Sequence, residues 1–350
     1  MNIETLNLNS NYQKNELKEF LKKFQLNFDE TIDYSLVIRK NEEIVATASK
    51  SKNIIKCFAI DDSLRGEGVT NTLVTTLLNK SFDQGIFHTF VFTKPSNEDI
   101  FKGVGFKPIS KTDKVALLEI GMNSIDKTID KIKSKLNWKE DSNNGLLIMN
   151  CNPFTLGHQF LIETAAKKMD NILVLVVEED KSSFPFLDRI ALVKKGTEYL
   201  KNVTVLPSTE YVISSATFPN YFLRKEDDSL VEFMKLDTKI TAEHFCKKLN
   251  ISTRFVGEEP FCEVTKKYND TMIKTFKEFN LEVCIIPRKE MEHCAISASQ
   301  VRALLKEDKL DEVKTLVPYS TYEYLISEKG KEITERIKNS NSVHWYRCLT

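Results

Sequence analysis

A motif of seven residues in the second half of the chain carries groups that could bind a phosphate. It reads Asn152-Pro153-Phe154-Thr155-Leu156-Gly157-His158 and lies between an apolar run and a stretch with helical spacing. The backbone N–H groups at the start of such a helix point at an anion. Gly157 would allow a close backbone approach, and His158 could donate a hydrogen bond to a phosphate oxygen as charge develops there. A plain strand–turn–helix with a surface histidine would also fit, and this motif alone leaves both interpretations open.

A second motif of the same kind follows later and reads Ile296-Ser297-Ala298-Ser299-Gln300-Val301-Arg302. Ser297 and Ser299 can cap a helix and leave its first N–H groups facing an anion. Arg302 follows three residues after Ser299, on the same side of the first turn, where its planar fork could hold a triphosphate. A serine cap beside a solvated arginine is the plain alternative. Two such helix starts after strands of one sheet favour a nucleotide site.

The elements that must position these motifs alternate between strand and helix. This alternation predicts a doubly wound parallel sheet, an α/β fold of the Rossmann-like type. Ligands of such a sheet bind at the carboxyl ends of its strands, so both motifs are expected at that edge. The expected strands are 146–150, 172–177, 203–206, 254–256 and 282–287, and the expected helices are 161–169, 186–200, 264–279 and 299–306.

The first half of the chain has a different pattern, typical of an α+β domain. Strand-like runs at 34–39 and 43–49 flank a hairpin turn. A third run at 54–60 is followed by a glycine-containing turn, a helix at 69–79 and a strand at 87–93. The expected domains are therefore 1–121, a linker helix over 122–144, a second domain over 145–338 and a tail over 339–350.

Composition limits the class of protein. The 350 residues fit two domains, and 50 basic residues balance 50 acidic ones, which argues against a nucleic-acid binder acting through bulk charge. The N-terminus lacks the features of a signal peptide, and the long uncharged run at 145–162 is too polar to span a membrane. Seven cysteines form no CxxC pair, which favours reduced thiols, and no protein metal ligands are expected. The expected location is cytoplasmic, with no nucleic-acid or membrane partner.

Together, Thr-x-Gly-His after the first strand and Ile-Ser-x-Ser-x-x-Arg after the last resemble the motifs of the nucleotidylyltransferase superfamily. The resemblance implies attack on the α-phosphate of a nucleotide with loss of pyrophosphate. His158 would stabilise that phosphate, with Thr155 in the position often held by another histidine. Ser297, Ser299 and Arg302 would hold the β and γ phosphates, and Mg²⁺ would complete the neutralisation.

Two longer stretches resemble the citrate lyase ligase family, and the resemblance spans nearly the whole chain. It implies an enzyme that uses ATP to form acetyl-adenylate from acetate. The acetyl group would then pass to the thiol of the phosphopantetheine-type prosthetic group on the citrate lyase acyl carrier subunit. Arg189 falls where related enzymes have an acidic–arginine pair, and either a structural salt bridge or a substrate contact would explain it. The matching stretches are 149–158 and 256–260 with Thr265, Tyr268 and Asn269, and the implied ATP contacts include Asn152, Pro153, Phe154, Gly157, Gly257 and Glu258.

In the first domain, the turn with Arg65, Gly66 and Gly68 resembles the pyrophosphate-binding turn of the GCN5-related N-acetyltransferases (GNAT), and 97–106 resembles a later motif of that family. The resemblance implies a GNAT-like fold whose turn could cradle a pantetheine-type or coenzyme A-type arm. Ser63 replaces the usual Gln or Arg. Phe101 replaces the tyrosine that protonates the departing thiolate, and a phenyl ring has no proton to give. We therefore expect this domain to dock the arm rather than to transfer acetyl groups.

Three alternatives to the ligase stay open at this point. The first is a nucleotidylyltransferase that adenylylates a small phosphorylated metabolite, since phosphate and carboxylate nucleophiles need similar pockets. The second is a non-catalytic nucleotide sensor fused to an acyltransferase-like module. The third is an acetyl-CoA-dependent N-acetyltransferase, which Phe101 disfavours. The Asn-Pro-Phe-Thr and Gly-Glu-Glu-Pro stretches and the additional N-terminal domain favour the ligase.

Overall fold

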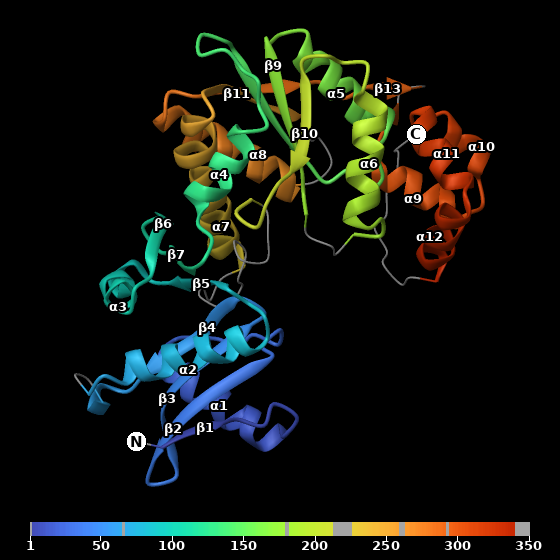
Figure 1. The fold of residues 1–350 in the computed structure, drawn as a ribbon. Helices are drawn as coiled ribbons and strands as arrows, with labels where there is room; N and C mark the ends of the chain where they lie inside the picture. Colours follow the sequence, from blue (N-terminus) through green and yellow to red (C-terminus); the bar gives the residue numbers. More distant parts are fainter. Residues whose placement is uncertain are drawn as a thin grey trace. The chain divides into compact units, whose positions relative to one another are not determined.

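The computed structural model describes residues 2–64, 67–178, 182–212, 226–258, 263–291 and 294–339. The chain forms two compact units (Figure 1). Unit 1 comprises Met1–Thr128 and Ser215–Ile240, and unit 2 comprises Ile129–Ser214 and Thr241–Thr350. The domain limits expected from the sequence, at 121, 144 and 338, remain a prediction.

In the described residues of unit 1, a mixed sheet has the strand order β1-β2-β3-β4-β5-β7-β6. The parallel pair β4–β5 is short, joining Ile54 to Phe90 and Ile55 to Val91, and the other pairs are antiparallel. This is the α+β architecture expected of the first half of the chain. The elements are β1 (Ile3–Thr5), α1 (Asn11–Lys23), β2 (Tyr34–Lys40), β3 (Glu43–Ser51), β4 (Ile54–Ile60), η1 (Asp62–Leu64), α2 (Val69–Asp83), β5 (His88–Thr93), η2 (Pro95–Asn97), α3 (Glu98–Gly103), β6 (Lys107–Lys111), β7 (Ala116–Gly121) and α7 (Glu226–Ile240).

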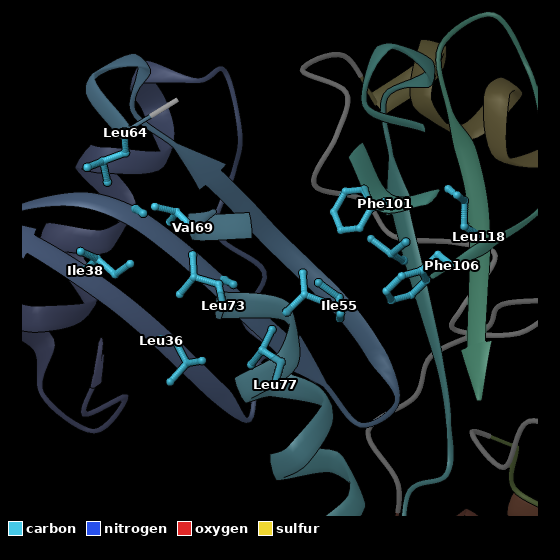
Figure 2. Close-up of a cluster of buried hydrophobic side chains, with 14 of the residues drawn as sticks. Leu36, Ile38, Ile55, Leu64, Val69, Leu73, Leu77, Phe101, Phe106 and Leu118 are labelled. Carbon is cyan, nitrogen blue, oxygen red and sulfur yellow. The ribbon is translucent and has the colours of Figure 1, made fainter. Parts of the chain in front are cut away.

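The sheet of unit 1 has a hydrophobic core on each face. Successive side chains of a strand point to opposite faces, and β2 illustrates this. Leu36 and Ile38 pack in one cluster with Leu73 and Leu77 of α2, as Figure 2 shows. Val37 belongs to a second cluster, which includes Leu17, Phe20 and Leu21 of α1. Helices on both faces therefore bury the sheet.

Unit 2 is built on a parallel sheet with the order β10-β9-β8-β11-β12. The expected doubly wound fold is thereby confirmed, because the chain runs outward from β8 on one side and then from β11 on the other. The elements are α4 (Ile125–Lys133, which begins in unit 1), β8 (Asn144–Met149), α5 (Leu156–Ala166), β9 (Asn171–Val176), α6 (Phe186–Thr197), β10 (Val203–Pro207), the π-helix η3 (Thr241–Cys246), β11 (Ile251–Gly257), α8 (Glu263–Glu278), β12 (Glu282–Ile286), β13 (Glu290–Met291), β14 (Cys294–Ala295), α9 (Ala298–Lys306), α10 (Leu310–Lys314), α11 (Tyr319–Ile326) and α12 (Glu328–Lys338).

The central strands of unit 2 are apolar on both faces, as parallel strands covered by helices must be. Leu147 of β8 and Val174 of β9 pack in one cluster with residues of α5 and α6, while the alternate residues Leu146 and Leu173 are also buried. The order of the strands reverses between β8 and β11. Ligands of doubly wound sheets bind beyond the carboxyl ends of the strands at such a point. Among the described helices, none is long and apolar enough to cross a membrane.

The core of unit 2 predicts how two leucine substitutions should differ. Leu147 is 1% exposed in β8, whereas Leu187, in the first turn of α6, is 73% exposed. Leu147→Ala should lower the free energy of unfolding by about 2–5 kcal/mol, because it leaves a cavity. Leu187→Ala should change it by about 0.5 kcal/mol or less. Denaturant unfolding followed by circular dichroism measures both, and equal losses would contradict the assignment of β8 to the core.

Candidate active site

The first motif connects β8 to α5 and closes on itself through Thr155 and His158. Thr155 is the N-cap of α5, and its hydroxyl accepts a hydrogen bond from the backbone N–H of His158 at 3.4 Å. In return, the backbone N–H of Thr155 donates to Nδ1 of His158 at 3.1 Å. This is a capping box in which a histidine takes the place usually held by Glu or Gln.

This contact fixes the tautomer of His158. A backbone N–H can only donate, so Nδ1 is the unprotonated nitrogen and Nε2 carries the proton. The Thr155 hydroxyl, 2.9 Å from Nδ1, then also donates to it. Burial lowers the pKa of His158 to about 4, and the charges of Arg288 and Arg302 act in the same direction. The ring is therefore neutral near pH 7, and within the described residues its Nε2–H has no partner and can serve a ligand.

The second motif starts α9 and approaches the first. Ser297 is the N-cap, and its hydroxyl accepts from the backbone N–H of Gln300 at 3.1 Å. Arg302 donates from Nη2 to the Ser299 hydroxyl at 3.1 Å and from Nη1 to the carbonyl oxygen of Asn152. Arg302 thus joins the two motifs through a contact with a residue 150 positions earlier in the sequence.

Gly157 explains how closely the two helix starts can approach. A Cβ at this position would lie 2.8 Å from the carbonyl oxygen of Ile296, closer than side chains tolerate. The contact with the second motif therefore requires a glycine at this position. The close approach of a phosphate to this backbone, which the sequence suggested, stays a prediction. The first turns of α5 and α9 lie side by side as a result.

Long-range contacts that the sequence did not indicate hold the first motif in place. Phe154 is buried, and its carbonyl oxygen accepts from the Thr321 hydroxyl of α11 at 3.0 Å. The backbone N–H of Leu156 donates to the carbonyl oxygen of Leu316 at 2.9 Å. A Cβ on Gly196 of α6 would lie 2.5 Å from the Phe154 ring. A glycine inside a helix is a sequence signal of close packing, whereas Thr321 offers no such signal.

Asn152 and Pro153 shape the turn, and both oxygens of Asn152 are used within the protein. The peptide bond between them is cis, and Pro153 is buried. The side-chain oxygen of Asn152 accepts from the backbone N–H of Phe184 at 3.0 Å, while its carbonyl oxygen is used by Arg302. Both residues therefore lie at the expected site, and the hydrogen bonds of Asn152 with Phe184 and Arg302 stabilise the turn.

Gly257 and Glu258 lie at the carboxyl end of β11, on the same edge of the sheet. The backbone N–H of Glu258 donates to Ile286 at 2.9 Å, and its carbonyl oxygen accepts from Nε of Arg288 at 2.8 Å. A Cβ on Gly257 would lie 3.8 Å from Leu161 of α5. The turn is thus next to α5, and the remainder of the Gly-Glu-Glu-Pro stretch lies outside the described residues.

Arg189 is fully buried and clamps backbone segments together. Its Nε donates to the carbonyl oxygen of Phe184 at 2.9 Å. Its Nη1 donates to the carbonyl oxygens of Asn150 at 2.8 Å and Val177 at 2.7 Å. The neighbouring Asp188 pairs with Lys329 of α12. These hydrogen bonds to backbone carbonyl oxygens favour a structural role for Arg189.

Unit 1 contains a groove at the GNAT-like turn. Arg65 and Gly66 lie outside the described residues, whereas Gly68 is the N-cap of α2 with φ of 70°, a left-handed conformation that favours glycine. The groove has a volume of about 1170 Å³ and lies between the ends of β4 and β5 and the first turn of α2, with Phe58, Phe92 and Phe101 in its lining. Phe101 is buried and packs against Phe58 and Phe106, with ring centroids 5.2 Å and 5.7 Å apart.

The parallel sheet and the two joined motifs define unit 2 as a nucleotidylyltransferase-like α/β domain. Residues 144–325 match the family described as "Citrate lyase ligase C-terminal domain". A protein of Escherichia coli K12 named [citrate [pro-3S]-lyase] ligase is 36% identical over 317 residues, covering 89% of each chain. A protein of Haemophilus influenzae with the same name is 37% identical over 317 residues, and the match covers 88% of this chain and 94% of that protein. The chain belongs to the citrate lyase ligase family and is thus an enzyme, a ligase.

Solved structures with lower similarity match parts of the chain. A GNAT-family acetyltransferase of Staphylococcus aureus Mu50 covers 35% of this chain and 100% of its own, with 16% identity and a TM-score of 0.30. Thermotoga maritima TmcAL, solved with α-thio ATP, covers 56% of this chain and 57% of its own, with 13% identity and a TM-score of 0.33.

The geometry of His158 predicts an unusual titration. Its ring should carry the proton on Nε2 and should not titrate between pH 5.5 and 8, because burial holds its pKa near 4. An unfolded histidine titrates near about 6.5, so the folded state binds this proton less readily, and stability should fall as the pH drops from about 6.5 toward 4. NMR of ¹⁵N-labelled histidine measures both properties. A midpoint near 6.5, or a proton on Nδ1, would contradict the capping geometry.

Proposed function

We propose that this protein is an ATP-dependent ligase that activates citrate lyase. It would acetylate the thiol of a phosphopantetheine-type prosthetic group on the citrate lyase acyl carrier subunit, with AMP and pyrophosphate as products. The observation that carries the proposal is the contact of Arg302 with Ser299 and with the Asn152 carbonyl. This contact brings together two helix N-termini, a guanidinium and a neutral histidine donor at one edge of the sheet. The chain is also a member of the citrate lyase ligase family.

In the first step, a carboxylate oxygen of acetate attacks the α-phosphorus of ATP. The bond from that phosphorus to the bridging oxygen breaks, and pyrophosphate leaves with the electron pair, so acetyl-adenylate forms. The Nε2–H of His158 would donate to an α-phosphate oxygen, where negative charge develops. Arg302, the Ser297 and Ser299 turn and the N-termini of α5 and α9 would hold the β and γ phosphates. The protein supplies no nucleophile, because positioning and electrostatics are sufficient for this chemistry.

Mg²⁺ would supply further neutralisation of the triphosphate. Among the described residues, no group of three or more His, Cys, Asp or Glu side chains could hold a metal ion. The expected phosphate contacts of the two motifs, His158, Arg302 and the two serines, are cationic or neutral, and they fit phosphate oxygens rather than a metal. Mg²⁺ usually keeps several waters and takes one or two carboxylates besides substrate phosphates, so the nucleotide and water would supply most of its ligands.

In the second step, the thiolate of the carrier arm attacks the acetyl carbonyl carbon, and AMP leaves with the carboxylate oxygen that had joined acetyl to phosphate. The thiol proton passes to solvent, and a thioester forms. The groove of unit 1 would receive the arm, held at the turn of Arg65, Gly66 and Gly68. Its buried Phe101 has no proton to donate, which supports capture of the arm over acetyl transfer from coenzyme A.

A direct assay tests this function. The protein is incubated with ATP, Mg²⁺ and acetate, with and without deacetylated citrate lyase, while pyrophosphate, AMP and recovery of citrate cleavage are followed. The ligase should form AMP and restore cleavage in the presence of the lyase. Absence of AMP would contradict the proposal. Nucleotide binding without pyrophosphate release would indicate a sensor, and pyrophosphate release that requires a phosphorylated metabolite would indicate a simple nucleotidylyltransferase.

His158→Ala should lower kcat by a factor of about 10² or more, the usual effect of removing a donor that stabilises transition-state charge. His158→Gln, which keeps a side-chain N–H donor, should recover part of the loss. Rates of acetate-dependent pyrophosphate release measure both variants at saturating ATP. A His158→Ala enzyme with the wild-type turnover would remove His158 from the mechanism.

The groove of unit 1 is tested by filling it. Ser96 lies in its lining and is exposed, so Ser96→Trp should narrow the groove without disturbing the core. Acetyl transfer to the carrier should slow by about tenfold or more, while formation of acetyl-adenylate stays unchanged, since loss of a well-filled binding contact costs on the order of 1–3 kcal/mol. Lys107→Trp, on the exposed edge strand β6, is the matched control. Unchanged transfer by Ser96→Trp would exclude this groove as the binding site of the arm.

A further inference from the structure

We infer that Asn150 determines specificity for the carboxylate substrate, and that its side-chain amide donates a hydrogen bond to that substrate. The inference rests on the proposed function, because it names the residue that receives the acid which attacks ATP. The substrate class is a small monocarboxylate such as acetate.

Asn150 lies where the attacking group must approach. It is the first residue after β8 and precedes Asn152, the residue bound by Arg302, by two positions. Two residues of chain span at most about 7 Å. In transfer at phosphorus, the attacking and leaving oxygens lie roughly in line. Arg302 and Ser299 would hold the leaving pyrophosphate. Asn150 lies on the β9 side, because Nη1 of Arg189 donates both to its carbonyl oxygen and to that of Val177, the residue after β9.

Arg189 fixes the orientation of the Asn150 amide. A guanidinium has donors and no acceptor, so the side-chain atom 2.9 Å from its Nη1 must be the oxygen Oδ1. The other terminal atom of the amide is therefore the nitrogen Nδ2, which donates one proton to the Ser182 hydroxyl at an N–O distance of 3.1 Å. Within the described residues the second proton has no partner. The side chain of Asn150 is exposed, so a ligand can reach it.

The charge of Arg189 makes this amide a better donor for an anion. Arg189 is fully buried, and in such surroundings its charge is weakly screened and polarises the amide that accepts from it. A carboxylate that accepts from Nδ2 would thus be attracted by a guanidinium that it does not touch. The neutral amide orients one carboxylate oxygen and leaves the carboxylate ionised, as attack on phosphorus requires.

Asn150→Asp tests the inference because it is isosteric. Arg189 still finds an acceptor, whereas the donor to the substrate becomes a second carboxylate oxygen that repels it. Acetate-dependent pyrophosphate release should show a KM for acetate raised by about tenfold or more, with the KM for ATP unchanged. Asn150→Ala, which removes the donor without adding charge, should give an intermediate KM for acetate. Thermal unfolding of each variant checks that the fold is retained.

Asn280→Asp is the matched control, because Asn280 is exposed just before β12, at the opposite edge of the same sheet. It should leave both KM values unchanged. An unaltered KM for acetate in the Asp and Ala variants, or an equal rise in both KM values, would overturn the role of Asn150. A wild-type enzyme without acetate-dependent pyrophosphate release would instead refute the proposed function. The two failures are therefore distinguishable.

Discussion

The contact between Arg302 and the carbonyl oxygen of Asn152 is the interaction on which the site depends. It holds the start of α9 against the turn that follows β8. Gly157 permits this approach, because any side chain there would collide with Ile296. Each helix start alone is an ordinary capped terminus. Joined, they bring two sets of backbone N–H groups, a guanidinium and a histidine donor together at the switch point of a parallel sheet.

The neutral state of His158 follows from the same arrangement. Burial disfavours a charged imidazole, and the charges of Arg288 and Arg302 would also repel it. The capping hydrogen bonds use Nδ1 and direct the remaining proton outward from Nε2. In the proposed mechanism Thr155 would act on the ligand through His158, since its own hydroxyl is buried and bonded to that residue. The sequence showed only that Thr155 stands where related enzymes often have another histidine, and that likeness did not indicate a contact with His158.

Much of the fold and the turns of the site could be predicted from the sequence, because they depend on short-range signals. Apolar strands, the cap at Thr155 and the serines before α9 act within a few residues of each other. The contacts that lock the site could not be predicted, because they join distant segments. Thr321 holds Phe154 across 167 residues, and Arg302 reaches Asn152 across 150. The short edge strands β1 and β6 were missed for a related reason, since three to five partly polar residues carry little periodicity.

The central claim is that acetate attacks the α-phosphate of ATP at this site and that the acetyl group then passes to the carrier thiol. Acetate labelled with ¹⁸O in its carboxylate tests the order of bonds directly. The AMP formed with deacetylated citrate lyase should contain one labelled oxygen, since the oxygen that attacks phosphorus stays with AMP when the thiol takes the acetyl group. Mass spectrometry of AMP gives the answer. AMP without the label, formed while the lyase is acetylated, would contradict an acetyl-adenylate and the mechanism built on it.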